Sequence, residues 1–253
     1  MNKILISTLT ALICPFSLGI AAPVTAEFAD GNSTSAVDGY VGTAGAGWKG
    51  PWVLVSKDAV FSATVEDNAP LKTGAGKYLS AKANTAGGVS YAGGSINRNY
   101  TDGIDPTQPV KYTFLIRPEV ISSQTRYMIF DAPVSQPSTG PNMTWAIVLA
   151  GASWNVFNGD QAGGGKEIQT GVTAEKGAVY AITVNADPTA KTFTLKIADA
   201  AGGVLYTSEA LGLRSNTSDK LGGYLTFAFA DTIPDTPDAF GFSIDSVSIS
   251  QGR

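Results

Sequence analysis

The chain has 253 residues, of which 17 are basic and 21 acidic, so its formal net charge is −4. It contains no histidine, which excludes a Ser-His-Asp triad, a Cys-His pair, a histidine metal site and a histidine general base. The acidic balance and the absence of a dense basic run argue against nucleic acid or an anionic membrane surface as a partner.

Residues 1–26 have the features of a secretory signal peptide. Lys3 supplies a charged start, residues 4–22 are mostly apolar, and Val24-Thr25-Ala26 provides small residues before a cut at Glu27. No later segment reaches the roughly 20 apolar residues that a membrane-spanning helix needs. We therefore expect residues 1–26 to be removed and residues 27–253 to form a single exported domain, secreted or periplasmic, without a membrane span.

The single cysteine, Cys14, lies inside this predicted signal, and the bulky Ile13 before it argues against attachment of a lipid. The mature chain then has no disulfide, zinc–thiolate site or cysteine nucleophile. It must be stabilised by its hydrophobic core, and its length suits one large all-β domain.

A glycine-rich stretch from Gly42 to Trp52, GTAGAGWKGPW, carries two tryptophans. Their rings either stack on a sugar or close one end of a hydrophobic core. The stretch also contains the pattern G-x-G-x-x-G, but Pro51 and the strand-like residues 52–56 follow it where a dinucleotide site needs a helix. We therefore exclude a dinucleotide cofactor here.

Several segments alternate apolar and polar residues with a period of two, which is typical of half-buried antiparallel strands. They are residues 110–117, 178–184, 191–197 and 225–229, and Asp187-Pro188 marks a turn between the second and the third. The expected inward-facing side chains are Val110, Tyr112, Phe114, Ile116, Phe193, Leu195, Ile197, Leu225, Phe227 and Phe229. The sequence shows no convincing amphipathic helix and no linker, so the predicted fold is all-β, a two-sheet antiparallel sandwich or jelly roll.

Residues 153–161, SWNVFNGDQ, are the best candidate for a ligand site. Trp154 offers a flat apolar face for a sugar ring. The side chains expected to hydrogen-bond sugar hydroxyls are Asn155, Asn158, Asp160 and Gln161. The alternative is a buried tryptophan followed by an Asn-Gly hairpin turn.

The last predicted strand changes its phase part of the way along. Its apolar positions are Phe240, Phe242 and Ile244 in one phase and Val247 and Ile249 in the other. One extra residue must be absorbed at Asp245-Ser246, which predicts a β-bulge that redirects Asp245.

Oxygen-rich loops can bind calcium. Glu27 and Asp30 open the predicted mature chain, and Asp245 lies at the bulge near its end. If the chain ends meet, these three carboxylates predict a weak structural calcium site. Solvated turns are the alternative.

Polysaccharide hydrolysis on a jelly roll needs carboxylates that project from one strand over a cleft. No Glu-x-Asp pair occurs in the chain, and Glu66-Asp67 is adjacent, so on a strand these side chains face opposite sides. A lyase would need a tyrosine or lysine base beside arginine. Residues of that kind are Tyr112, Arg117, Arg126 and Tyr127. The sequence therefore favours a protein without catalysis, and an enzyme of unrecognised type stays open.

Three stretches together resemble the concanavalin A-like lectin/glucanase superfamily, and in particular laminin-G-like jelly-roll domains of exported bacterial proteins. They are EFADG with GYVGTAGAGWKGPWVL (27–31 and 39–54), GAVYAITVNADPTAKTFTLKI (177–197) and FGFSIDSVSIS (240–250). The resemblance implies a concanavalin A-like sandwich, in which Trp48 and Trp52 pack where the first strand joins the fold. It does not extend to the glucanase active-site motif.

The function that this combination favours is an exported, non-catalytic, lectin-like protein that binds a glycan or acts at the cell surface. One alternative is a polysaccharide-active enzyme, either a lyase or a glycoside hydrolase. The other is a purely structural surface protein.

Overall fold

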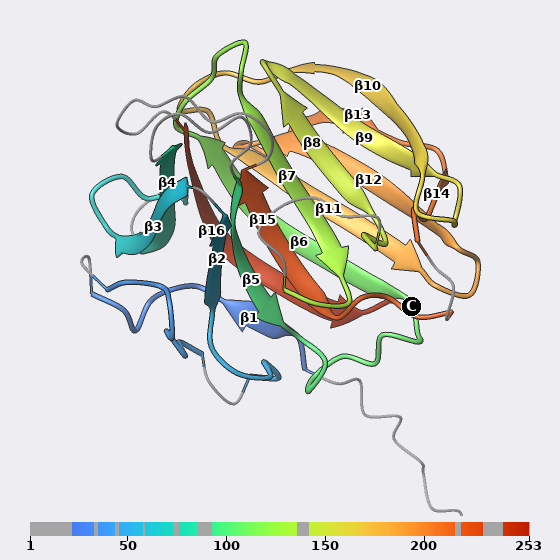
Figure 1. Ribbon diagram of the computed structural model, residues 1–253, viewed down its shortest axis with the longest axis horizontal. Helices are drawn as coiled ribbons and strands as arrows, with labels where there is room; N and C mark the ends of the chain where they lie inside the picture. The colour runs from blue at the N-terminus through green and yellow to red at the C-terminus, as the bar shows by residue number, and fades with distance from the viewer. Residues whose placement is uncertain are drawn as a thin grey trace, which may run out of the picture.

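The computed structural model describes residues 22–32, 35–43, 46–57, 59–72, 76–85, 93–135, 142–215, 219–229 and 240–252. The first 21 residues, which hold most of the predicted secretory signal, lie outside these ranges. The described residues form strands and turns without a helix, and they contain no helix long and apolar enough to cross a membrane. The strands form two antiparallel sheets that lie face to face (Figure 1).

Sheet A has nine strands, in the order β13-β12-β11-β6-β16-β4-β3, with β1 paired to β16 and β14 to β12. Its strands are β1 (Val24–Ala26), β3 (Ala59–Glu66), β4 (Tyr78–Thr85), β6 (Val110–Pro118), β11 (Tyr180–Asp187), β12 (Thr192–Asp199), β13 (Val204–Thr207), β14 (Leu211–Gly212) and β16 (Phe240–Gln251).

Sheet B has seven strands, in the order β10-β9-β8-β7-β15-β5-β2. Its strands are β2 (Val53–Lys57), β5 (Gly93–Asn99), β7 (Arg126–Ala132), β8 (Ala146–Ala150), β9 (Ser153–Gly159), β10 (Gly165–Thr173) and β15 (Tyr224–Phe229).

The core lies between the two sheets and is filled by alternate residues of each strand. The inward-facing side chains predicted for residues 110–117, 191–197 and 225–229 are all buried there. Phe114 of β6 meets Phe227 of β15 edge to face, with ring centroids 5.2 Å apart, and so joins sheet A to sheet B. This confirms the predicted all-β, two-sheet jelly-roll sandwich, whose stability comes mainly from apolar burial.

The predicted β-bulge in the last strand is also present. Between Asp245 and Ser248 the pairing of β16 with β6 shifts register, and Ser246 has a positive φ of 52°. One extra residue therefore enters β16, which lets both of its apolar phases face the same core.

The two ends of the described chain lie side by side, because β1 pairs with β16 through Val24↔Ile249 and Ala26↔Val247. Val24 is fully buried. A Cβ added to Gly47 would come within 2.6 Å of Val24 Cγ2 and 2.9 Å of Gly103 Cα. The backbone at these two glycines therefore packs directly against the valine side chain. Residues just before Glu27 are thus part of the sandwich.

We expect a chain that begins at Glu27 to be less stable than one that begins at Ala22. Full burial of one valine is worth about 1.5–3 kcal/mol, and the shorter chain also leaves the edge of β16 without β1. Denaturant unfolding of the two chains measures the difference. The N-terminal sequence of the exported protein then shows whether secretion removes residues 1–26, as predicted, or spares β1. Equal stability would mean that β1 adds nothing.

Candidate functional site

The two tryptophans of the glycine-rich stretch belong to the core. Trp52 is fully buried and Trp48 is 6% exposed, and their ring centroids lie 5.7 Å apart. The buried guanidinium of Arg98 stacks on Trp48 at 4.7 Å and donates hydrogen bonds to the carbonyl oxygens of Gly50 (3.0 Å) and Gly42 (2.8 Å). The structural interpretation of these rings is confirmed, because neither has a face open to a sugar.

Trp154 is fully buried as well, and its ring meets the ring of Tyr180 edge to face, with centroids 5.6 Å apart. The prediction that Trp154 presents a face to a ligand is therefore wrong. Asn155 is the next residue on β9, and because a strand alternates its faces it points to the outer side of sheet B. There its amide donates to Glu167 Oε1 at 2.6 Å, and Glu167 also pairs with Arg126 at 2.9 Å.

The other polar residues of this segment hold the β9–β10 connection together. Asn158 accepts the backbone N–H of Gly212 at 2.7 Å, which links β9 to β14. Asp160 accepts two backbone N–H groups of its own turn, from Ala162 and Gly164, both at 2.9 Å. Gln161 has a positive φ of 68° and is exposed. The structure thus places these residues in a turn and does not gather them around Trp154.

The three predicted calcium ligands have separate partners. Glu27 forms an exposed ion pair with Lys72 at 3.2 Å. Asp30 accepts a hydrogen bond from the Tyr40 hydroxyl, which lowers the pKa of Asp30. Asp245 is buried, which raises its pKa, and it accepts the N–H of Ser246 at 2.6 Å. Among the residues that the structure describes, no group of three or more acidic side chains is arranged to hold a metal ion, so the predicted set does not assemble.

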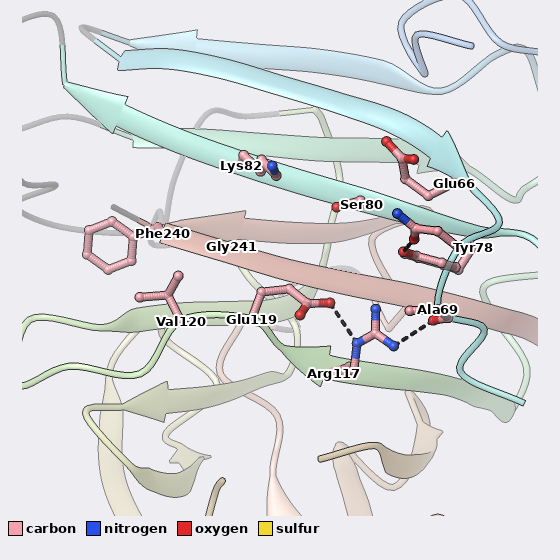
Figure 2. A pocket seen from close by; sticks show the side chains of 11 residues that line it. Glu66, Ala69, Tyr78, Ser80, Lys82, Arg117, Glu119, Val120, Phe240 and Gly241 are labelled. Carbon is pink, nitrogen blue, oxygen red and sulfur yellow. Dashed lines mark hydrogen bonds and ion pairs between the residues drawn. The ribbon is translucent and has the colours of Figure 1, made fainter. Parts of the chain in front are cut away.

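A cavity of about 400 Å³ lies on the outer face of sheet A and is the strongest candidate site (Figure 2). It spans β4, β16 and β6, which are neighbours in the sheet, and is bounded by the residues that follow β3 and β6. Its lining residues are Glu66, Asn68, Ala69, Tyr78, Ser80, Lys82, Arg117, Glu119, Val120, Phe240 and Gly241. This volume is within the range of small-molecule sites.

Strand alternation explains the floor of the cavity. On β4 the residues Leu79, Ala81 and Ala83 face the core, so Tyr78, Ser80 and Lys82 face outward. On β16 the outward position between β4 and β6 is Gly241, where an added Cβ would lie 3.2 Å from Glu119 Cβ. The missing side chain keeps this part of the floor open.

Arg117 of β6 fixes one wall of the cavity. Its Nε donates to Glu119 Oε1 at 2.7 Å, and a terminal nitrogen donates to the Ala69 carbonyl at 2.6 Å (Figure 2). Its guanidinium carbon lies 5.0 Å from the centre of the Tyr78 ring. The arginine side chain is only 11% exposed, so its charge is used within the protein to join three separate segments.

The two glutamates of the cavity are each held through one oxygen. Glu119 Oε1 accepts from both Arg117 and the buried hydroxyl of Ser243, and Glu66 Oε1 accepts from Thr64 at 2.8 Å. No described residue donates to the second oxygen, Oε2, of either glutamate. Each carboxylate therefore keeps acceptor capacity for a ligand.

The aromatic residues of the lining are buried, since Tyr78 is 4% exposed and Phe240 belongs to the core. Tyr78 lines the cavity, and burial raises the pKa of its hydroxyl, which donates to Asn68. Tyr112 and Tyr127, which the sequence offered with Arg117 as candidate lyase residues, are both buried in the core. Alternation along β4 predicts that Tyr78, Ser80 and Lys82 face outward. It does not predict that they lie beside Glu119.

No protein-family model matches this chain, and no curated protein matches it either. Its fold does occur in solved structures. A protein of unknown function, SO2946 from Shewanella oneidensis MR-1, matches with a TM-score of 0.60 and 12% identity over 96% of each chain. A sialidase matches with a TM-score of 0.55 and 13% identity over 92% of this chain, which spans 19% of the sialidase. Peanut lectin, solved with a nine-residue peptide, matches over 79% of this chain and 97% of its own, with 11% identity and a TM-score of 0.46.

These identities are too low to assign a family, and the first two matches show a shared fold. The cavity on sheet A is therefore the feature from which function has to be argued. The chain is an all-β sandwich of the jelly-roll class, similar in fold to SO2946 and to one part of a sialidase.

Proposed function

We propose that this protein is an exported, lectin-like protein that binds a glycan, without catalysis, in the cavity on the outer face of sheet A. One observation carries the proposal: a single cavity is lined by two carboxylates, those of Glu66 and Glu119, and each keeps one oxygen available. Sugars present many hydroxyl donors, so these carboxylate oxygens have a partner on the ligand.

Two further observations support the proposal. The charged, apolar and small-residue segments within residues 1–26 favour secretion, where extracellular glycans are accessible. A sialidase is among the proteins that contain this fold, which is compatible with a carbohydrate ligand. Because one fold serves many functions, the cavity lining remains the main support.

A second function is favoured by the same two glutamates. Glycoside hydrolases use a pair of carboxyl groups on either side of the scissile bond, and Glu66 and Glu119 line one cavity. We prefer binding, because Glu119 is held by Arg117 and Ser243 in a network that suits a fixed hydrogen-bond acceptor. Turnover decides between the two.

The test is a glycan array read beside reducing-sugar and lyase-absorbance assays on the same polysaccharides. We expect weak binding, with a Kd of roughly micromolar to millimolar, and no turnover. Turnover on any polysaccharide would contradict the non-catalytic role. The absence of both binding and turnover in all three assays would contradict glycan binding and favour a structural surface protein.

The cavity is tested by filling it. Ser80→Phe adds a ring on its floor, outside the core, and should weaken glycan binding at least tenfold while leaving stability nearly unchanged. Thr183→Phe on β11 is the matched control, because Thr183 faces the same side of sheet A but does not line the cavity. Equal glycan affinities of the two variants would show that the glycan binds outside this cavity.

A further inference from the structure

We infer that the cavity on sheet A selects uncharged glycans and rejects sugars that carry a carboxylate or a sulfate. This inference rests on the proposed function and names its ligand class. The formal charges of the lining cancel, because Glu66 and Glu119 are balanced by Lys82 and Arg117. Discrimination between neutral and anionic glycans therefore depends on which of these charged groups can contact the ligand.

The arginine is the group best suited to bind an anion, and two of its five N–H donors are already engaged within the protein. Recognition of a carboxylate by arginine is strongest when two parallel N–H groups are free to form a fork. In Arg117, Nε is bound to Glu119, a terminal nitrogen is bound to the Ala69 carbonyl, and the planar face lies over Tyr78. An anionic sugar would have to displace Glu119 to use the Nε edge of the guanidinium.

Lys82, the second cation of the lining, has an interaction of its own, whereas the two carboxylates each keep one oxygen without a described donor. Oε2 of Glu66 and Oε2 of Glu119 receive no hydrogen bond from a described residue, and a carboxylate can only accept. A sugar hydroxyl can donate to such an oxygen, whereas a uronate or sulfate group near it would be repelled. The lining therefore favours a ligand that is rich in hydroxyl donors and has no negative charge.

Substitution of Glu66 gives a test in which the sign of the effect identifies the ligand class. Glu66 is chosen because it has no arginine partner in the described residues, unlike Glu119. For a neutral glycan, Glu66→Gln should weaken binding by about tenfold, since a charge-assisted hydrogen bond is lost. For an anionic glycan the same change would strengthen binding, because a like charge is removed. Glu175→Gln, an exposed carboxylate in the turn before β11, is the charge-matched control.

Binding is measured by calorimetry with neutral glucan, mannan, galactan and xylan oligosaccharides, and with uronate and sialylated oligosaccharides, at about 0.1 M and about 1 M salt. The expected result is a neutral ligand whose affinity changes little with salt and falls in Glu66→Gln but not in Glu175→Gln. A ligand that binds more tightly to Glu66→Gln would overturn the inference and leave glycan binding intact. So would a neutral ligand whose affinity is the same for the wild-type protein and for Glu66→Gln. Absence of binding to every oligosaccharide would instead remove the proposed function itself.

Discussion

Trp52→Ala should lower the free energy of unfolding by about 3–5 kcal/mol, as large aromatic truncations in protein cores do. Trp52 is fully buried and packs against Trp48 and Phe28, with ring centroids 5.7 and 5.8 Å away. Removal of the indole also leaves the buried guanidinium of Arg98 without one of its two aromatic neighbours. The lost volume lies where the glycine-rich stretch joins the sandwich, so neighbouring side chains are poorly placed to refill it.

Denaturant unfolding at constant temperature measures this loss, with Val204→Ala as the control because Val204 is 56% exposed. Glycan binding by the folded fraction should survive in Trp52→Ala, since Trp52 does not line the cavity on sheet A. A variant with unchanged stability and lost binding would show that this ring contacts ligand after all.

At about pH 4, Asp131→Asn should destabilise the protein by about 1–3 kcal/mol, which is the cost of a buried donor left without a partner. Asp131 is fully buried, and each of its oxygens accepts a backbone N–H: Oδ2 from Gly222 at 2.5 Å and Oδ1 from Gly223 at 3.0 Å. Tyr100 and Thr144 donate their hydroxyls to the same carboxyl group. An asparagine NH₂ must therefore face one of the two glycine N–H groups in either orientation.

The pH dependence of Asp131 provides a second readout. Burial raises the pKa of Asp131 from 3.8 to about 6. Since this pKa is raised on folding, the stabilising contribution is fully present below about pH 4 and is lost as the pH rises through about 6; a shift of this size is worth about 3 kcal/mol. The stability difference between the wild-type protein and Asp131→Asn should therefore shrink from pH 4 to pH 7 in denaturant unfolding. A difference that grows with pH would show that the four donors outweigh burial and favour the carboxylate.

The sequence predicted the core well because alternation along a strand is a local property. Phe193, Leu195 and Ile197 could be assigned to the inner face without knowing any neighbouring strand, and the phase change after Ile244 required a bulge wherever β16 lay. The same alternation rules out the predicted ligand site around Trp154. Asn155 follows it on the same strand, so the ring and that amide could never have shared one face.

Alternation does not predict which outward-facing residues are exposed. Asn97 and Thr226 point to the outer side of sheet B, yet both are fully buried and hydrogen-bonded to each other at 2.7 Å. The cavity on sheet A is hidden from the sequence for a related reason. Tyr78 and Glu119 are far apart in the chain and meet only because β16, the last strand, inserts between β4 and β6. The spacing of residues along the chain does not predict the order of the strands in the sheet.

The most direct test of glycan binding in this cavity is a backbone amide NMR titration of the isotope-labelled protein with the tightest oligosaccharide from the array. Shifts are expected at residues 78–82, 117–120 and 241–243, which lie on three neighbouring strands and share no segment of sequence. They should saturate with one common Kd and vanish in Ser80→Phe. Saturable shifts confined to residues 153–161, or to any other surface, without shifts at the cavity residues would contradict glycan binding in this cavity.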